Sequence, residues 1–230
     1  MPRSAFVWPT DAGMGVQAVP AGGARLGRAA DCDVRVEADT VSRAHAQVRF
    51  TDDHFVIENL SQTNPTQVND VAIAQPVPLA DGDRVKLGSV TLTFHDLAAA
   101  DRLSGPLCSH CSRENMADAD DCWYCGTSLV NAPTTILKPR FVACRLTSPA
   151  GTVHDLLPSH DLHLTADGTT DGEPVLVISA ADGGAVVGAV PGAAQVNDEP
   201  AMPGQALATG DVVRVGETAF VVIVRGSGDS

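Results

Sequence analysis

The sequence has no long apolar run and few aromatic residues. No stretch approaches the length of about 18 apolar residues that a membrane-spanning helix needs, and residues 1–9 lack a continuous apolar segment of signal-peptide length. Aromatic residues make up 4% of the chain, so valine, alanine and leucine must fill any interior. We therefore expect a cytoplasmic protein without a segment inserted into a membrane.

Positive charge is scarce. The 230 residues include 15 Lys and Arg against 28 Asp and Glu, which gives a formal net charge of −13. This charge repels phosphate backbones and anionic lipid surfaces, so we expect no nucleic acid partner. A local basic pocket can still bind a single phosphate, because salt screens charges over roughly 8 Å.

Helical periodicity is also missing, and 21 Gly and 15 Pro interrupt the chain. Short alternating runs typical of strands occupy residues 32–36, 45–50, 55–60, 84–87 and 90–94, with turn residues at 51–53, 69–70 and 81–83. After residue 141 the same pattern returns, as at residues 175–178 and 212–215. The sequence predicts an all-β protein.

One segment of the chain is repeated. Residues 67–88 align without a gap to residues 195–216, at a constant offset of 128 and with 10 identities in 22 positions. Self-similarity of this kind indicates two copies of one structural unit. We predict two β-sandwiches, over residues 1–98 and 140–227, with a small module at residues 106–130 between them.

Three separated motifs lie in the first copy. They are LGR at residues 26–28, SRAH at residues 42–45 and LSQTNPTQVND at residues 60–70. In this order, with strand-like spacers, they make residues 1–98 resemble the forkhead-associated (FHA) domain. The resemblance implies an eleven-stranded sandwich whose loops at one end bind a phosphothreonine peptide.

A phosphothreonine carries a charge of about −1.5 to −2 and three acceptor oxygens, so its receptor needs cations and neutral donors. By the resemblance, Arg28 would contact the phosphate and Ser42 would donate a hydroxyl hydrogen bond. Arg43 would add a second cation or a peptide contact. Thr63 would line the pocket, and Asn64 would hydrogen-bond the peptide backbone.

Other motif residues fit supporting roles. Gly27 precedes the arginine, Asn69 suits a turn, and His45 is expected to face inward and brace the loop that carries Ser42. Ser42 and His45 are three residues apart, so an extended chain sends their side chains to opposite faces and builds no Ser–His nucleophile pair. We expect no enzymatic activity.

The loop motif departs from the family pattern at two positions. Pro65 and Asp70 stand where the family usually has glycine. Proline fixes φ and removes an N–H group, so we expect a reshaped loop around Asn64 and an altered peptide selectivity.

Two CxxC pairs, separated by ten residues, occupy the module between the sandwiches. Their cysteines are Cys108, Cys111, Cys122 and Cys125. This spacing predicts a tetrahedral structural site for one zinc ion and is similar to short zinc ribbons. Trp123 and Tyr124 would either dock a protein or pack over the metal or a neighbouring domain. The remaining Cys32 and Cys144 are expected to be small buried hydrophobes.

The second copy lacks the Gly-Arg, SxxH and Thr-Asn motifs, so it resembles a degenerate FHA domain used for scaffolding, dimerisation or protein contact. Its histidines, at positions 154, 160 and 163, are irregularly spaced and are expected on the surface without a metal.

The motifs favour a phosphothreonine-binding adaptor in kinase-dependent signalling or complex assembly, with a phosphothreonine-containing protein as partner and a Ser/Thr kinase in the pathway. The alternative is a constitutive scaffold that docks unphosphorylated partners. A kinase that modifies Thr134 or Thr135 in the linker at residues 131–140 would let the first sandwich bind its own chain.

Overall fold

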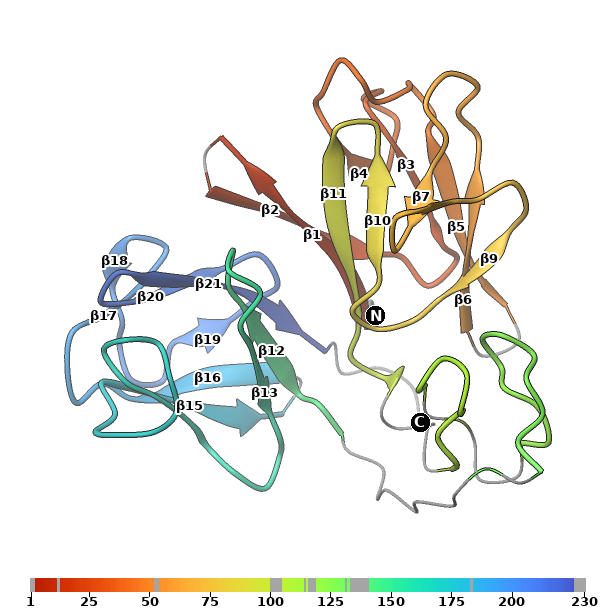
Figure 1. Cartoon of the computed structure of the whole chain (residues 1–230). Helices are drawn as coiled ribbons and strands as arrows, with labels where there is room; N and C mark the ends of the chain where they lie inside the picture. Colours follow the sequence, from red (N-terminus) through yellow and green to blue (C-terminus); the bar gives the residue numbers. More distant parts are fainter. Residues whose placement is uncertain are drawn as a thin grey trace.

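A computed structural model describes residues 3–11, 13–51, 54–99, 105–113, 115, 119–130, 132, 141–182 and 184–225. Every element with defined bounds in these ranges is a β-strand (Figure 1). The all-β class predicted from the sequence is therefore confirmed.

Eleven strands form the first sandwich. They are β1 (Ser4–Thr10), β2 (Gly13–Val19), β3 (Ala24–Gly27), β4 (Val34–Arg35), β5 (Ala46–Thr51), β6 (His54–Asn59), β7 (Gln67–Val68), β8 (Val71–Ala72), β9 (Val77–Leu79), β10 (Arg84–Leu87) and β11 (Val90–Asp96). One sheet has the order β2-β1-β11-β10-β7-β8 and the other β4-β3-β5-β6-β9. A buried cluster joins the sheets, and the Phe94 ring lies 5.1 Å from the rings of both Phe6 and Phe55.

Ten strands form the second sandwich. They are β12 (Cys144–Thr147), β13 (Val153–Leu156), β14 (Leu162–Leu164), β15 (Leu176–Ala181), β16 (Gly184–Ala189), β17 (Ala194–Val196), β18 (Glu199–Pro200), β19 (Ala206–Leu207), β20 (Val212–Val215) and β21 (Thr218–Val224). The sheet orders are β13-β12-β21-β20-β17-β18 and β14-β15-β16-β19. These orders repeat those of the first sandwich, strand for strand, except that the described residues supply no counterpart of β4.

The two sandwiches touch through their six-stranded sheets. Ala5 and Val7 of β1 and Leu97 share a buried apolar cluster with Val142 and with Ile223 of β21. Figure 1 shows the β1–β2 hairpin reaching toward the second sandwich. This contact sets the two copies side by side with corresponding sheets facing each other.

A buried arginine adds a polar contact at this junction. Nη1 of Arg145 donates to both carboxylate oxygens of Asp81, at 2.6 and 2.8 Å, while its Nε and Nη2 donate to Asp155 at 2.7 and 3.0 Å. Burial acts to raise the pKa of Asp81, but hydrogen bonds and charges from His95 and Arg145 outweigh it, and the pKa lies below its ordinary value. Arg145 thus links the first sandwich to β13 of the second.

Candidate functional site

The predicted binding residues come from three loops at one end of the first sandwich. Arg28 follows β3, Ser42 and Arg43 precede β5, and Thr63 and Asn64 lie between β6 and β7. The backbone N–H of Arg28 donates to the carbonyl of Ser42 at 3.1 Å, and the next N–H along the chain donates to the carbonyl of Arg43 at 3.2 Å. The first two loops are therefore joined at the residues that carry the predicted phosphate contacts.

Gly27 makes this close approach possible. A Cβ atom at this position would lie 2.2 Å from the carbonyl oxygen of Arg43 and 3.0 Å from Sγ of Cys32. Cys32 is buried, and its thiol donates to the same carbonyl at 3.1 Å. Any side chain at position 27 would push the two loops apart.

His45 lies fully buried beneath the loops. Its Nδ1 accepts the backbone N–H of Ser42 at 3.0 Å, and its carbonyl accepts the N–H groups of Leu60 and Ser61. Burial lowers the pKa of His45, against a smaller opposing effect of the Asn64 backbone. The ring is therefore neutral at pH 7, and it fixes the conformation of the loop that presents Ser42.

Ser61 connects the second and third loops, a role that the sequence motifs do not predict. Its Oγ lies 2.8 Å from Oγ of Ser42 and accepts the backbone N–H of Asn64 at 3.3 Å. The side-chain amide of Asn64 donates to the carbonyl of Thr40 at 2.9 Å. Ser42 and Asn64 are thus brought together through a buried serine.

A second layer holds the third loop from below. Oδ1 of Asn59 accepts the backbone N–H groups of Ser61 and Thr66, at 3.2 and 3.0 Å, and the hydroxyl of Thr66 at 3.0 Å. Thr66 is fully buried, whereas Pro65 beside it is exposed. The proline therefore sits in a loop whose two ends are anchored to one asparagine.

The binding residues predicted from the motifs lie on the exposed side of these loops. Arg28, Arg43, Thr63 and Asn64 are all exposed. Among the described residues no carboxylate pairs with Arg28 or Arg43, whereas the nearby Arg25 pairs with Asp31 at 3.4 Å. Two exposed guanidinium groups, those of Arg28 and Arg43, are available to an anion on the loops that also carry Ser42.

Asn69 stabilises a turn and takes no part in this surface. It and Asp70 have φ values of 50° and 67°, as the tight turn between β7 and β8 requires. Oδ1 of Asn69 accepts the N–H of Arg84 at 3.0 Å, and its amide donates to Asp83 at 2.9 Å.

The four cysteines of the CxxC pairs converge. Their sulfur atoms all lie within 4.8 Å of one another. The two cysteine turns share one hydrogen-bond pattern: the N–H of Cys108 donates to the carbonyl of Arg113 at 2.9 Å, and the N–H of Cys122 donates to that of Thr127 at 2.8 Å. Hydrogen bonds from the side chain and backbone of Thr127 lower the pKa of Cys125 to about 5. The donor set and its spacing are compatible with one zinc ion.

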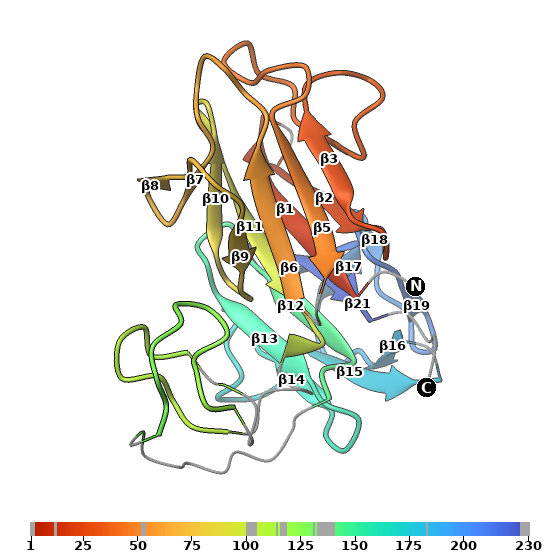
Figure 2. The same cartoon turned by 90° about the vertical axis from the view of Figure 1, so that its right-hand side faces the viewer.

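The cysteine module, residues 105–130, is attached to the first sandwich (Figure 2). Nη2 of Arg113 donates to the buried carboxylate of Asp83 at 2.6 Å, and its guanidinium carbon lies 4.0 Å from the centre of the Tyr124 ring. The Trp123 ring lies 5.9 Å from that of His54 on β6. The structure thus shows Trp123 packed against the neighbouring sandwich, whereas Tyr124 contacts Arg113 and Trp123 within the module.

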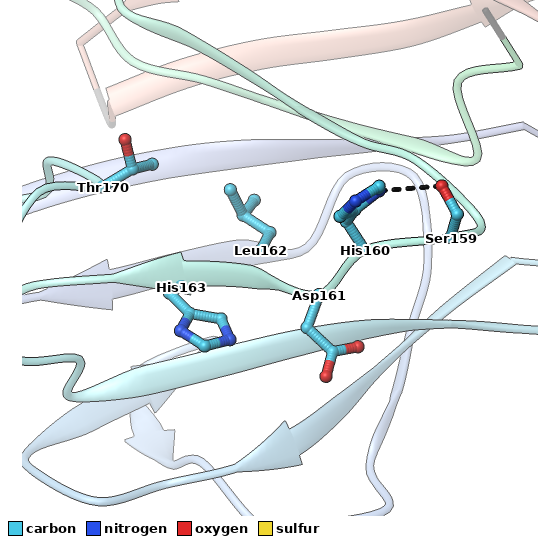
Figure 3. A pocket seen from close by; sticks show the side chains of 6 residues that line it. All are labelled: Ser159, His160, Asp161, Leu162, His163 and Thr170. Carbon is cyan, nitrogen blue, oxygen red and sulfur yellow. Dashed lines mark hydrogen bonds between the residues drawn. The ribbon is translucent and has the colours of Figure 1, made fainter.

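The corresponding loops of the second sandwich, residues 165–175 and 190–193, contain no Lys or Arg. Two of its histidines have separate hydrogen-bond partners. Nε2 of His154 contacts the carbonyl of Gly168 at 2.9 Å, and His160 contacts Ser159 at 2.8 Å (Figure 3). In the described part of the chain, the four cysteines are the only group arranged like metal ligands. Thr134 and Thr135 lie outside the described residues. Across the same part, no helix is long and apolar enough to cross a membrane.

The three loops that carry the predicted binding residues lie within a match to a known protein family. The FHA domain family model matches residues 24–88. Glycogen accumulation regulator GarA of Mycobacterium tuberculosis is 37% identical over 68 residues, 30% of this chain and 41% of that protein. Proliferation marker protein Ki-67 of Mus musculus is 36% identical over 71 residues, 31% of this chain and 2% of that protein. The chain thus spans less than half of the length of either relative.

Solved structures of FHA domains are among those similar to this chain. The FHA domain of FhaA, complexed with the intracellular domain of Rv3910, is 27% identical, with a TM-score of 0.37, and the alignment covers 40% of this chain and 99% of that one. The family match covers β3 to β10 and includes all three loops. Residues 24–88 of this chain thus match the FHA domain family model.

Proposed function

We propose that this protein is an adaptor that binds phosphothreonine-containing proteins through Arg28, Ser42, Arg43, Thr63 and Asn64. One observation carries the proposal: Arg28 and Ser42 are held together by a backbone hydrogen bond, and the Arg28 guanidinium has no carboxylate partner among the described residues. The FHA domain is a phosphopeptide-binding module, which supports the same function.

The chemistry of the surface suits a dianionic ester. Two guanidinium groups supply charge-assisted hydrogen bonds, and a serine hydroxyl adds a neutral donor. A plain threonine hydroxyl would leave both cations without an anion and would gain little over water. We expect binding to depend on the phosphate, which distinguishes this adaptor from a scaffold that docks unphosphorylated partners.

The direct test uses a degenerate peptide library with one fixed phosphothreonine, and the same library with threonine in its place. Full-length protein is expected to enrich sequences from the first library only. Equal enrichment from both libraries would favour the constitutive scaffold and would contradict the proposal.

The linker offers an internal ligand. We propose that a Ser/Thr kinase modifies Thr134 or Thr135 and that the FHA domain then binds the modified linker in competition with partners, because a tethered ligand has a high effective concentration. Phosphorylation of the linker should lower the affinity for a free phosphopeptide, and a Thr134→Val, Thr135→Val chain treated with the same kinase should keep its affinity. Equal affinities of the two treated chains would contradict this part of the proposal.

The cysteine cluster would hold one structural zinc ion through Cys108, Cys111, Cys122 and Cys125. Four sulfur ligands would close the coordination sphere. The ion would then supply folding free energy to a module whose buried cluster contains only Cys108, Cys122 and Leu129 among the described residues. Elemental analysis of the purified chain should give one zinc per molecule, and a Cys108→Ser, Cys125→Ser chain should lose it. A metal-free wild-type chain with an unchanged fold would contradict the assignment.

A further inference from the structure

The repeated segment builds the same hydrogen-bonded turn in both sandwiches. In the first, the amide of Asn69 donates to Asp83 at 2.9 Å, and the other carboxylate oxygen accepts the backbone N–H three residues earlier at 2.7 Å. In the second, the amide of Asn197 donates to Asp211 at 2.8 Å, and the other carboxylate oxygen accepts the N–H three residues earlier at 2.8 Å. The two aspartates are therefore equivalent, at the offset of 128 positions that relates the two segments.

These equivalent aspartates differ in burial and in charge partners. Asp83 is 2% exposed, and its Oδ1 also accepts a hydrogen bond from Nη2 of Arg113 at 2.6 Å. Asp211 is only partly buried, and no cation pairs with it in the part of the chain that the structure describes. The second sandwich therefore shows the same turn without a contact from the cysteine module.

Both cysteine turns fix the position of Arg113. Its carbonyl accepts the N–H of Cys108 and the side-chain amide of Asn115, both at 2.9 Å. Asn115 is fully buried, and its Oδ1 accepts the N–H of Trp123 in the second cysteine turn at 3.1 Å. The Tyr124 ring, also from the second turn, stacks on the Arg113 guanidinium. The arginine that reaches the first sandwich is thus held by the backbone and side chains that surround the four cysteines.

The cysteine sulfurs form the centre of this module. They lie within 4.8 Å of one another, and Leu129 is the one fully buried aliphatic side chain of the described cluster around them. Small modules with so little apolar interior take much of their folding free energy from the bound metal. We therefore expect the two cysteine turns to separate when the ion is removed, and Arg113 to leave Asp83.

We propose that the cysteine module is a metal-dependent clamp on the first sandwich, in which the bound ion keeps Arg113 on Asp83 and so holds the turn at residues 80–84 closed. The proposal rests on the zinc site proposed above. Without the ion, Asp83 keeps only the contacts that Asp211 has in the second sandwich. One charge-assisted hydrogen bond is lost, so the sandwich stays folded while its turn opens more often. The chain thereby links metal availability to the local stability of the first sandwich.

Hydrogen exchange of the full-length chain, followed by NMR, tests the clamp. The reporter amides are those of Ala80 and Arg84, which donate to Asp83 and Asn69 at 2.7 and 3.0 Å. Removal of zinc with a chelator, checked by elemental analysis, should speed their exchange about tenfold, the low end for loss of a hydrogen bond to a charged group.

The second sandwich supplies an internal control. The amides of Ala208 and Val212 make the same two hydrogen bonds, at 2.8 and 2.9 Å, to a turn that the described part of the module does not contact. Their exchange should be the same with and without zinc. Equal acceleration in both turns would mean that chelation loosens the whole chain, and it would overturn the proposal.

Three variants separate the clamp from metal binding. Arg113→Ala keeps all four cysteines, and its amides at residues 80 and 84 should exchange about as fast with zinc as without it. Arg113→Lys keeps the cation and should retain part of the zinc response, while Arg49→Ala, which removes an arginine elsewhere on the first sandwich, should retain all of it.

Two results would overturn the clamp alone: zinc that leaves the wild-type chain without changing exchange at residues 80 and 84, or an Arg113→Ala chain that responds to chelation as wild type does. In either case the zinc assignment would stand. A purified chain that holds no metal would overturn both the clamp and the zinc assignment.

Discussion

Replacing Arg28 by alanine isolates the contribution of one guanidinium group to phosphopeptide binding. Arg28 is exposed and has no ion pair among the described residues, so its removal should leave the free energy of unfolding nearly unchanged. Its loss would remove charge-assisted hydrogen bonds worth about 2 to 3 kcal/mol, which corresponds to roughly 30- to 150-fold weaker binding. Arg43 would still attract the phosphate, so weak binding should persist.

Fluorescence anisotropy with a library-selected phosphothreonine peptide measures this change. Arg49→Ala is the matched control, because Arg49 on β5 is also exposed and its removal changes the net charge by the same amount. The control should bind within about twofold of wild type, because Arg49 pairs with Glu58 and distant surface charges are screened at physiological salt. The Arg28 effect should also shrink as salt is added.

The reasoning fails if Arg28→Ala and Arg49→Ala weaken binding equally. Such a result would mean that long-range charge, and no specific contact with Arg28, drives association. It would also fail if Arg28→Ala weakened the unphosphorylated peptide as much as the phosphorylated one, because the guanidinium would then contact something other than the phosphate.

Three further outcomes are expected. Ser61→Ala should weaken phosphopeptide binding by about 2- to 12-fold in the same anisotropy assay, because a lost neutral hydrogen bond costs about 0.5 to 1.5 kcal/mol. Ser61→Thr keeps the hydroxyl and should restore most of the affinity. The free energy of unfolding, measured with urea, should fall as the pH drops below 6.5, because the unfolded chain then protonates His45 while burial keeps the folded ring neutral; His45→Asn should flatten part of this slope. Arg145→Ala should lower the free energy of unfolding by about 3 kcal/mol in thermal denaturation.

The N-terminal hairpin shows where sequence patterns fail. Pro9, Gly13 and Gly15 interrupt the alternation that predicts strands, yet β1 and β2 pair in register over seven residues. Trp8 lies opposite Gly15, and a Cβ atom on this glycine would lie 2.5 Å from the Trp8 ring. The Trp8 ring covers Gly15, which has no side chain. Pairing across the strands therefore outweighs the low strand propensity of glycine.

The candidate site was predictable to the extent that its residues belong to short motifs. Arg28, Ser42 and Asn64 stand in contiguous stretches with recognisable neighbours. Ser61 is different, because its importance comes from a contact with Ser42, 19 positions away. A serine next to a strand end reads as an ordinary surface hydroxyl until the two loops are placed side by side.

The turn at residues 81–83 also has a role that depends on contacts distant in the sequence. Its sequence, Asp81-Gly82-Asp83, predicts a reversal and nothing more. In the structure Asp83 accepts a hydrogen bond from Arg113 of the cysteine module, 30 positions away, and Asp81 accepts two from Arg145, 64 positions away. One tight turn thus anchors two other parts of the chain. Contacts of this range are not encoded in local pattern.

Comparison of the two copies explains why Arg145 should matter for stability. Ala5 pairs with His95 in the first sandwich, and Arg145 pairs with Ile223 at the equivalent positions of the second. Corresponding faces meet, and Nη1 of Arg145 in one copy lies 3.2 Å from Nδ1 of His95 in the other.

The contact therefore requires two unlike sandwiches, because Ala5 stands in the first sandwich at the position of Arg145 in the second. Two copies of the first sandwich would bring no arginine to Asp81. Removing the cation leaves Asp155 partly buried without its arginine and leaves Asp81 with His95 and the N–H of Asp96 as its partners. We expect a cost of about 3 kcal/mol, the low end for a buried pair, because both carboxylates keep some solvent. The control Arg214→Ala breaks a more exposed pair with Asp198 and should cost less than about 1 kcal/mol. Equal unfolding temperatures of the Arg145 and Arg214 variants would show that Arg145 does not hold the two sandwiches together.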